Sequence, residues 1–299
     1  MTAYDLLNSI ALFLILGLIT LAYSFRLLTH GRAEFDRVNK QGGSVLLGKG
    51  LMEMAYWGLQ PVARLLVFLH VSPNMLSWAS LVFGGLAGAA LTFGYFGFAA
   101  SFATYSAFMD VLDGMVARMT EVASDAGEVL DATVDRYVEF FFLGGLILFY
   151  RPVPMLQAIA MAALVGSFMI SYSTAKAEAL HMSPPPGIMR RPERAFYLTL
   201  GAALSPIHIP FLDRVFALPL VNPGYPLIIA TFVVAVLSNI SAIERLWTIG
   251  RDVRKREIEA VLAEEEAATV EETAVGSQDA AAVTDEAISE ENKPNPYLR

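Results

Sequence analysis

The chain contains no cysteine, so disulfide bonds and thiolate metal sites are excluded across all 299 residues. Histidine is also scarce, and no two histidines pair at the spacing of metal ligands. We expect each of the four to lie at a surface or an interface: His30, His70, His181 and His208.

Charged residues are sparse as well. They make up 17% of the chain, whereas 55% of it is hydrophobic. A soluble domain carries about 25% charged and about 45–50% apolar residues. Because the apolar excess lies in long blocks, the composition indicates an all-α integral membrane protein rather than a larger soluble core.

The charge that is present is unevenly distributed. The formal net charge is −8, but residues 257–299 alone hold twelve acidic and two basic side chains. The rest of the chain therefore has a small positive net charge. We expect residues 251–299 to form a basic and then acidic cytoplasmic tail, whose start extends a helix and whose remainder is largely disordered.

The first apolar stretch, residues 10–24, fits either a membrane anchor or a signal peptide. No positive region precedes it, no small-residue cleavage site is evident, and basic residues follow it from Arg26 onward. These features favour an anchor formed by residues 1–25.

Residues 26–70 form the expected juxtamembrane segment. Residues 26–50 are polar and include Gly42-Gly43, which predicts a loop or surface segment. Residues 51–70 mix large apolar side chains with Glu53 and Arg64. This mixture predicts an amphipathic helix at the membrane interface, with a further membrane span as the alternative.

Six further apolar segments each approach the roughly 20 residues that cross the hydrocarbon core of a bilayer. Prolines and short connections separate them. We expect a six-helix core within residues 71–250, with spans at 75–96, 97–119, 127–149, 153–177, 190–211 and 224–247.

Basic residues collect at one set of span ends, whereas the opposite connections hold only Arg151 and Arg214. By the positive-inside rule, the basic ends face the cytoplasm. The sequence therefore predicts a multi-pass protein of the cell membrane, with Met1 outside.

Four aspartates lie where the second and third expected spans meet on the cytoplasmic side. On each helix, a spacing of three or four residues puts a pair on one face: Asp110 with Asp113, then Asp131 with Asp135. Ionised groups at membrane depth are costly and usually serve a function. A short turn would bring the two faces together, where the carboxylates would repel one another unless cations lay between them. Oxygen ligands favour Mg²⁺ or Mn²⁺ over zinc.

Small residues share these two helix faces. Gly114, Ala117 and Gly127 leave the surface open for a bulky ligand such as a nucleotide, and Arg118 could bind a phosphate bidentately. The alternative is tight helix packing, with aspartates that cap helix ends. That alternative does not account for four aspartates in register on two faces.

The complete pattern is D-x2-D-G-x2-A-R-x8-G-x3-D-x3-D, from Asp110 to Asp135. It resembles the signature of the CDP-alcohol phosphotransferases, and the likeness covers about residues 70–250. The resemblance implies transfer of a phosphatidyl group from CDP-diacylglycerol to a hydroxyl acceptor, with release of CMP. It also implies two Mg²⁺ or Mn²⁺ ions and a homodimer, and no nucleic-acid partner is expected.

The resemblance further implies a role for each residue of the pattern. Asp110, Asp113 and Asp131 would be metal ligands. Asp135 would contact the second metal ion and act as the base that takes the proton of the acceptor hydroxyl. The CDP site would be formed by six residues: Gly114, Ala117, Arg118, Gly127, Asn74 and Ser77.

A second set of polar residues lies at the ends of the fourth and sixth expected spans and at the start of the fifth. Its cations could bind an acceptor phosphate or could snorkel to the interface as ordinary positive-inside residues. Together with the string V-L-D-A-T-V-D-R at residues 129–136 and R-P-E-R at residues 191–194, the arrangement resembles the branch that makes phosphatidylinositol phosphate. This resemblance implies inositol phosphate as the acceptor. Thr174 departs from that branch, where a basic residue is usual, and this keeps glycerol 3-phosphate or another polyol open. The candidate acceptor residues are Lys176, Arg191, Arg194 and Arg245.

Two functions of other classes fit parts of the sequence. A cation transporter would need carboxylates distributed across the membrane depth, whereas these aspartates cluster on one side. A non-catalytic scaffold that recruits partners through its tail would not need the complete pattern.

Overall fold

The computed structural model describes residues 3–31, 48–185, 187–207, 210–216 and 218–291. These ranges are helical with no β-strand, so the all-α prediction is confirmed. The chain divides into two compact units, Met1–Arg245 and Leu246–Arg299. The helices are α1 (Ala3–His30), α3 (Lys49–Phe68), α4 (Pro73–Thr92), α5 (Phe96–Met119), α6 (Asp125–Phe149), α7 (Pro154–Ala179), α8 (Arg191–Leu204), α9 (Pro210–Phe216) and α10 (Tyr225–Glu291).

Serine caps define where α4 and α6 begin. Ser72 Oγ accepts a hydrogen bond from the backbone N–H of Met75 at 3.4 Å, and Pro73 occupies the first helical position. Ser124 Oγ accepts one from the backbone N–H of Gly127 at 3.2 Å. Each cap satisfies an N–H group that has no partner within its helix, and so fixes the register of the side chains that follow.

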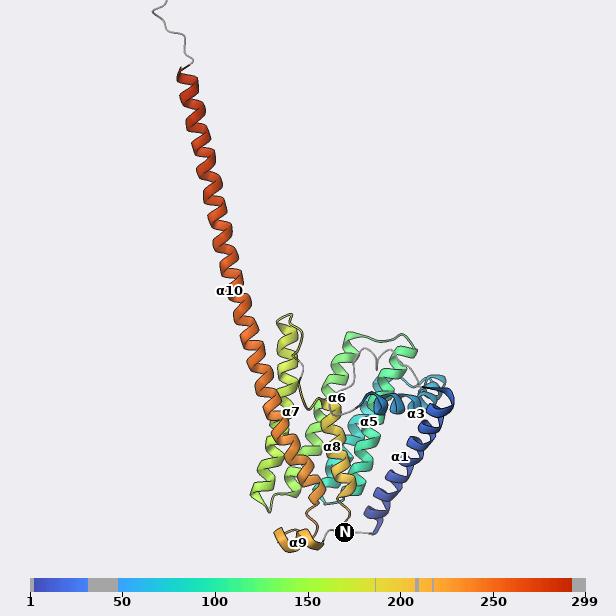
Figure 1. Cartoon of the computed structure of the whole chain (residues 1–299). Coiled ribbons are helices and arrows are strands. Elements are labelled where there is room, and N and C mark those ends of the chain that lie inside the picture. The colour runs from blue at the N-terminus through green and yellow to red at the C-terminus, as the bar shows by residue number, and fades with distance from the viewer. Residues whose placement is uncertain (1–2, 32–47, 186, 208–209, 217, 292–299) are drawn as a thin grey trace, which may run out of the picture. The chain divides into compact units, whose positions relative to one another are not determined.

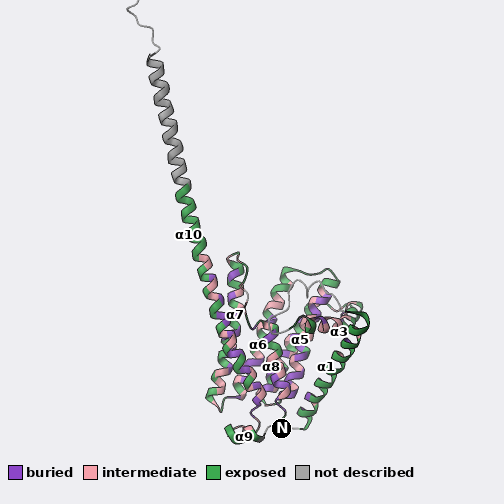
Figure 2. Ribbon diagram, in the orientation of Figure 1, coloured by how far each residue is buried: buried purple, intermediate pink, exposed green. Residues whose placement is uncertain are grey.

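α4 lies at the centre of the first unit and packs against both α5 and α6. Figure 1 shows these helices side by side with α7 and α8. The backbones of α4 and α6 approach so closely that a Cβ on Gly145 would lie 2.1 Å from the carbonyl oxygen of Gly88. Any side chain there would push the two helices apart. The buried residues in Figure 2 gather along these helix contacts.

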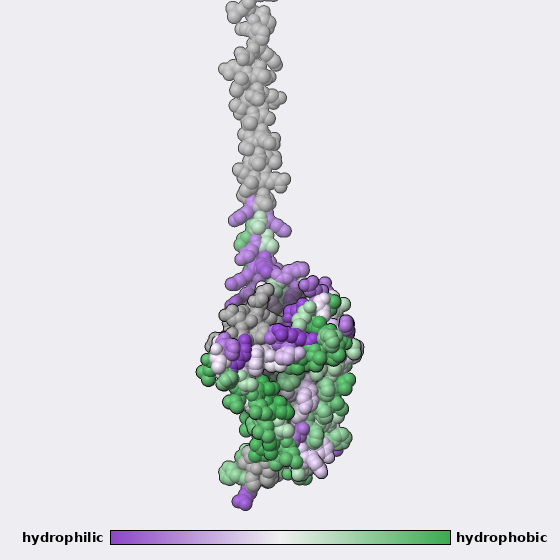
Figure 3. Space-filling view, turned by 90° about the vertical axis from the view of Figure 1, so that its right-hand side faces the viewer, coloured by the Kyte–Doolittle hydropathy of each residue, from purple (hydrophilic) through white to green (hydrophobic). Residues whose placement is uncertain are grey.

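The outer surface of the bundle is strongly apolar. Figure 3 shows hydrophobic side chains over much of the body and hydrophilic ones gathered towards one end. Phe93 and Met155, for example, are 76% and 75% exposed. Among the described residues, α1, α4, α7 and α10 are long and apolar enough to cross a bilayer. These features indicate an integral membrane protein.

The expected six-span core stays a prediction. Helices occupy all six expected positions, but the fifth is shorter than expected, because α8 has 14 residues and ends at Leu204 rather than at 211. At 1.5 Å per residue α8 is about 21 Å long, less than the roughly 30 Å of a hydrocarbon core. Pro206 and Pro210 follow its end, and proline cannot continue a helix without losing a hydrogen bond.

Polar side chains attach α1 to the start of α5. Asp5 Oδ1 accepts a hydrogen bond from the backbone N–H of Phe98 at 3.0 Å. Asn8 Nδ2 donates to Gly97 O at 2.9 Å and to Ser101 Oγ at 2.8 Å. α1 contains the apolar stretch expected at 10–24 and extends it at both ends. Its role as a membrane anchor stays a prediction.

α3 corresponds to the amphipathic helix expected at 51–70. One side of it packs against the second half of α5, where Ala63 joins a buried cluster with Leu112, Met115 and Val116. α3 therefore supports the end of α5 that carries the aspartates. Its place at the membrane interface stays a prediction, and most of the loop expected at 26–50 lies outside the described residues.

The second unit differs from the expected tail. A largely disordered segment was expected over 251–299, whereas α10 continues to Glu291. Alanine and glutamate dominate this stretch and are among the strongest helix formers. No proline interrupts residues 227–293, so local helix propensity outweighs the high charge.

Candidate active site

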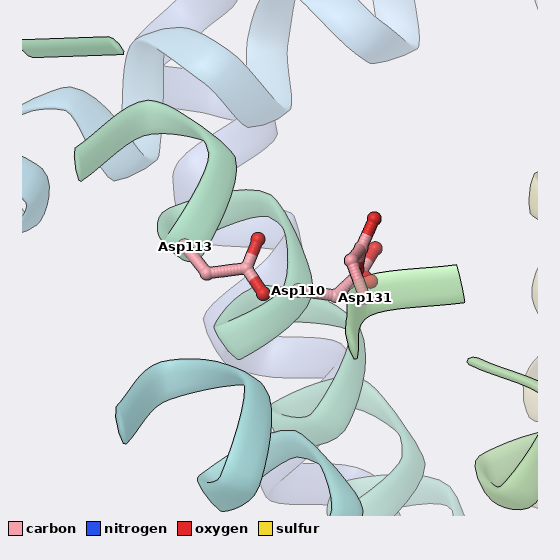
Figure 4. Close-up of side chains that lie close together, drawn as sticks. All are labelled: Asp110, Asp113 and Asp131. Atoms are coloured by element: carbon pink, nitrogen blue, oxygen red, sulfur yellow. The ribbon is translucent and has the colours of Figure 1, made fainter. Parts of the chain in front are cut away.

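Three of the four predicted aspartates converge. Asp110 and Asp113 project from α5 and Asp131 from α6, and one carboxylate oxygen from each lies within 4.8 Å of the others. Figure 4 shows the three side chains directed towards one another. Three adjacent carboxylates repel one another strongly unless a cation separates them. A donor set made only of carboxylate oxygens fits a hard divalent ion such as Mg²⁺ or Mn²⁺.

Ser77 connects α4 to this cluster. Its hydroxyl donates a hydrogen bond to Asp113 Oδ2 at 2.7 Å, and both side chains are buried. The contact fixes one carboxylate oxygen of Asp113 and leaves the other available to a ligand. Asn74 lies at the start of α4 and is exposed. The sequence predicted Ser77 as a nucleotide contact, whereas in the structure it touches a candidate metal ligand.

Asp135 lies one turn beyond Asp131 on α6 and is 8% exposed. Its carboxylate forms an ion pair with the guanidinium of Arg191, at the first turn of α8. Nη2 of Arg191 also lies 3.4 Å from Asp110 Oδ1. Arg191 therefore bridges α5, α6 and α8, and it places a positive charge beside two of the four aspartates.

Arg194 has a different environment from Arg191. It is 1% exposed, and its guanidinium pairs with both carboxylate oxygens of Glu139, at 2.6 and 3.0 Å. Nη1 of Arg194 also donates to the carbonyl oxygen of Met189 at 2.8 Å. These contacts hold the turn before α8 against α6, and the protein itself engages all three guanidinium nitrogens of Arg194.

Sequence reasoning missed Glu139. Its signal was nonetheless present, because Glu139 continues the four-residue repeat of Gly127, Asp131 and Asp135 along one face of α6. The pairing with Arg194 spans 55 residues, so sequence spacing alone gives no indication of it.

Of the two remaining acceptor candidates, Lys176 lies in the last turn of α7 and Arg245 lies in α10. Nη1 of Arg245 donates a hydrogen bond to Thr174 Oγ1 at 3.0 Å. A Cβ on Gly187 would lie 2.6 Å from Arg245 Nε, so the chain after α7 passes directly over this guanidinium. Lys176 is exposed. Thr174, the residue that departs from the expected pattern, is thus a partner of Arg245.

The small residues predicted to line a nucleotide site lie beside the carboxylates. Gly114 and Ala117 on α5 and Gly127 on α6 are half-buried, and Arg118 is exposed at the end of α5. A Cβ on Gly127 would meet Ser124 Oγ at 3.4 Å, which is an ordinary contact, so the surface there is open rather than tightly packed.

Comparison with known proteins gives a consistent result. The profile of the CDP-alcohol phosphatidyltransferase family matches residues 70–237. Phosphatidylinositol phosphate synthase of Corynebacterium glutamicum is 35% identical over 161 residues, which cover 51% of this chain and 72% of that protein. The enzyme of the same name from Mycolicibacterium smegmatis is 31% identical over 195 residues, covering 64% of this chain and 82% of that one.

Solved structures agree with the sequence relatives. Mycobacterium tuberculosis phosphatidylinositol phosphate synthase with CDP-DAG bound superposes with a TM-score of 0.55 and 27% identity, over 63% of this chain and 92% of that chain. The same enzyme in complex with manganese and citrate gives a TM-score of 0.53 and 28% identity, over 63% and 87% of the two chains. On the profile match, the relatives and the fold together, this chain belongs to the CDP-alcohol phosphatidyltransferase family.

Proposed function

We propose that the chain transfers the phosphatidyl group of CDP-diacylglycerol to a hydroxyl of inositol phosphate and releases CMP. The observation that carries this proposal is the convergence of three carboxylates within 4.8 Å. The relatives named phosphatidylinositol phosphate synthase, one of them solved with CDP-DAG, support the choice of substrates. Their names favour inositol phosphate over glycerol 3-phosphate as the acceptor.

Asp110, Asp113 and Asp131 would hold a divalent cation, Mg²⁺ or Mn²⁺, and Asp135 would help to hold a second. The relative solved with manganese supports this assignment, as does the all-oxygen donor set. When bound, the ions would neutralise the pyrophosphate and stabilise the attacking and leaving oxygens.

Asp135 would take the proton of the acceptor hydroxyl. The acceptor oxygen then forms a bond to the phosphorus that carries diacylglycerol, and the bond from that phosphorus to the CMP oxygen breaks. The proton ends on the Asp135 carboxylate, and CMP leaves with the electron pair of the broken bond. The burial of Asp135 limits access by water, which would otherwise compete as an acceptor.

Arg191 would bind the phosphate of the acceptor. Its guanidinium is half-buried beside Asp135, so a phosphate bound to it would lie next to the proposed base. Lys176 and Arg245 would supply further positive charge. Arg194 is held by Glu139, and we propose that it positions the start of α8 instead of touching the acceptor.

The CDP moiety would lie along the small-residue faces of α5 and α6, where Gly114, Ala117 and Gly127 leave room and Arg118 offers a phosphate contact. Asn74 would contact the nucleotide from α4. Ser77 would act through Asp113, whose carboxylate it orients.

The membrane arrangement follows from the same proposal. Residues 71–250 would form a six-span core, with α3 at the interface and the active site facing the cytoplasm. There the lipid donor would enter from the bilayer and the polar acceptor from water. We also propose that the protein forms a homodimer, as the family resemblance implies.

The proposal is tested by measuring how fast the purified protein releases CMP from CDP-diacylglycerol. The assay contains Mg²⁺ or Mn²⁺ and either inositol phosphate or glycerol 3-phosphate as the acceptor. We expect metal-dependent release that is fastest with inositol phosphate and lost in Asp135→Asn. Faster turnover with glycerol 3-phosphate would change the acceptor. No turnover with any acceptor, together with metal flux into liposomes that needs no nucleotide, would instead favour the transporter.

A further inference from the structure

A groove separates α1 from α3, on the side of α3 that faces away from the aspartates. Figure 1 shows the two helices next to each other at one edge of the molecule. The groove is open to its surroundings and has a volume of about 390 Å³. Its lining is mostly apolar: Leu18, Ile19, Ala22, Trp57, Gly58, Gln60, Pro61 and Arg64.

The walls of the groove are fixed by contacts between the two helices. Tyr23 Oη donates a hydrogen bond to Glu53 Oε2 at 3.2 Å, and both residues are buried. The rings of Tyr23 and Trp57 lie 5.5 Å apart. A Cβ on Gly58 would already touch Ile19 at 3.5 Å. The hollow therefore lies beside a formed helix contact and is not a gap between unattached segments.

One arginine, Arg64, lines the groove, and a second, Arg26, lies against its tryptophan. The guanidinium of Arg26 lies 5.9 Å from the centre of the Trp57 ring, and its Nη1 is buried without a hydrogen-bond partner among the described residues. Leu18, Ala22 and Arg26 recur every four residues, so an apolar strip on α1 leads to this charge. Arg64 is exposed and lines the groove from α3.

A second surface groove provides a contrast. It is open, has a volume of about 280 Å³ and lies between the end of α4 and the start of α5. Its lining holds no charged residue: Leu86, Ala89, Ala90, Phe93, Tyr95, Phe98 and Phe102. Such a surface suits any acyl chain, whereas the lining of the α1–α3 groove combines apolar side chains with the charge of Arg64.

We infer that the α1–α3 groove binds an anionic phospholipid, with an acyl chain along Leu18 and Ala22 and the phosphate at Arg64. Basic residues at a membrane surface attract anionic headgroups, and the indole of Trp57 suits the level between chain and headgroup. This lipid is distinct from the donor, because α3 lies between the groove and α5. The opposite side of α3, at Ala63, packs against Leu112 and Met115.

The site lies outside residues 70–237, the part that matches the family. It is therefore an addition to the chemistry proposed above and does not depend on it. Because α3 contacts both the groove and the aspartate-bearing half of α5, a bound lipid would stabilise the packing of α3 against the catalytic end of α5.

Trp57 can report binding directly. In a Trp78→Phe/Trp247→Phe background it is the one remaining tryptophan, and brominated acyl chains quench indole fluorescence on contact. The protein is placed in nanodiscs of unbrominated phosphatidylcholine that contain increasing fractions of brominated phosphatidylglycerol or brominated phosphatidylcholine. We expect half-quenching at an about fivefold lower fraction of phosphatidylglycerol, as one arginine contributes about 1 kcal/mol.

Matched variants localise the effect. Arg64→Gln should reduce the preference to less than about twofold, and Ala22→Phe should weaken quenching by both lipids because it fills the groove. Arg214→Gln and Ala89→Phe are the controls for a distant charge and for the uncharged groove, and should leave the preference intact. Equal quenching by the two lipids in the background protein would overturn the inference. So would a preference that survives Arg64→Gln or that disappears equally in Arg214→Gln.

Discussion

The carboxylates of the candidate site and the arginines around it are stabilised in opposite ways. Asp110, Asp113 and Asp131 lie within 4.8 Å of one another, so their charges repel and favour an external cation. Arg194, by contrast, is paired with Glu139, and Arg191 forms ion pairs with both Asp135 and Asp110. The difference indicates that the three aspartates are arranged to bind a cation, whereas Arg194 stabilises the packing of α8 against α6. Arg191 contributes to this packing and also lies beside the candidate site.

Removing one carboxylate should have the largest effect on activity. Asp131→Asn keeps the shape of the side chain but weakens the metal donor set. Since loss of an outer-shell partner alone costs about 10–100-fold in metal affinity or activity, loss of a ligand should cost more than about 100-fold. CMP release measures it, and Asp125→Asn, an exposed aspartate at the start of α6, is the matched control. Equal loss in the two variants would contradict a specific metal site.

Breaking the Glu139–Arg194 pair should destabilise the fold. Glu139→Gln leaves Arg194 buried without a compensating charge, which typically costs about 3–5 kcal/mol. The measurement is the free energy of unfolding in detergent. Glu139→Leu/Arg194→Met removes both charges and should recover much of the loss. If the double variant were less stable than Glu139→Gln, the pair would not be the reason.

Removing the hydrogen bond that orients a candidate metal ligand should lower metal affinity more than it lowers maximal turnover. Ser77→Ala deletes the 2.7 Å hydrogen bond to Asp113. We expect the Mn²⁺ concentration for half-maximal activity to rise about tenfold, with maximal activity largely restored at saturating metal. Ser80→Ala, which alters a buried serine of α4 that bonds Ser106 instead, is the control. An unchanged metal requirement would show that Ser77 does not support the site.

Deleting the acidic tail should have the smallest effect. All residues of the candidate site lie within Met1–Arg245, so removal of residues 258–299 should change the rate of CMP release by less than twofold, about the scatter expected of independent regions. A large loss would show that the second unit takes part in catalysis.

The aspartates could be predicted from sequence because they obey local geometry. Helical spacing places Asp110 with Asp113 and Asp131 with Asp135, and a short turn joins the two helices. The arginines could not be assigned in this way. Whether Arg191 and Arg194 face a ligand or a counterion depends on pairing with α6, more than fifty residues earlier in the chain, and spacing says nothing about such contacts.

The fold shows the same division between local and distant information. Helix positions and the serine caps follow from nearby residues, such as Ser72 and Ser124. Pro206 and Pro210 are local indications that α8 ends early. The prediction placed the end at 211 because the segment stays apolar up to that point. The hydrogen bonds of Asp5 and Asn8 to α5 cross about ninety residues and had no signal in the sequence.

The central claim is that Asp110, Asp113 and Asp131 form a divalent metal site, and anomalous diffraction from crystals grown with Mn²⁺ and CDP-diacylglycerol tests it most directly. The account predicts a manganese peak among these three carboxylates in the parent protein, greatly reduced in Asp131→Asn. Manganese bound only elsewhere, or an undiminished peak in the variant, would contradict it.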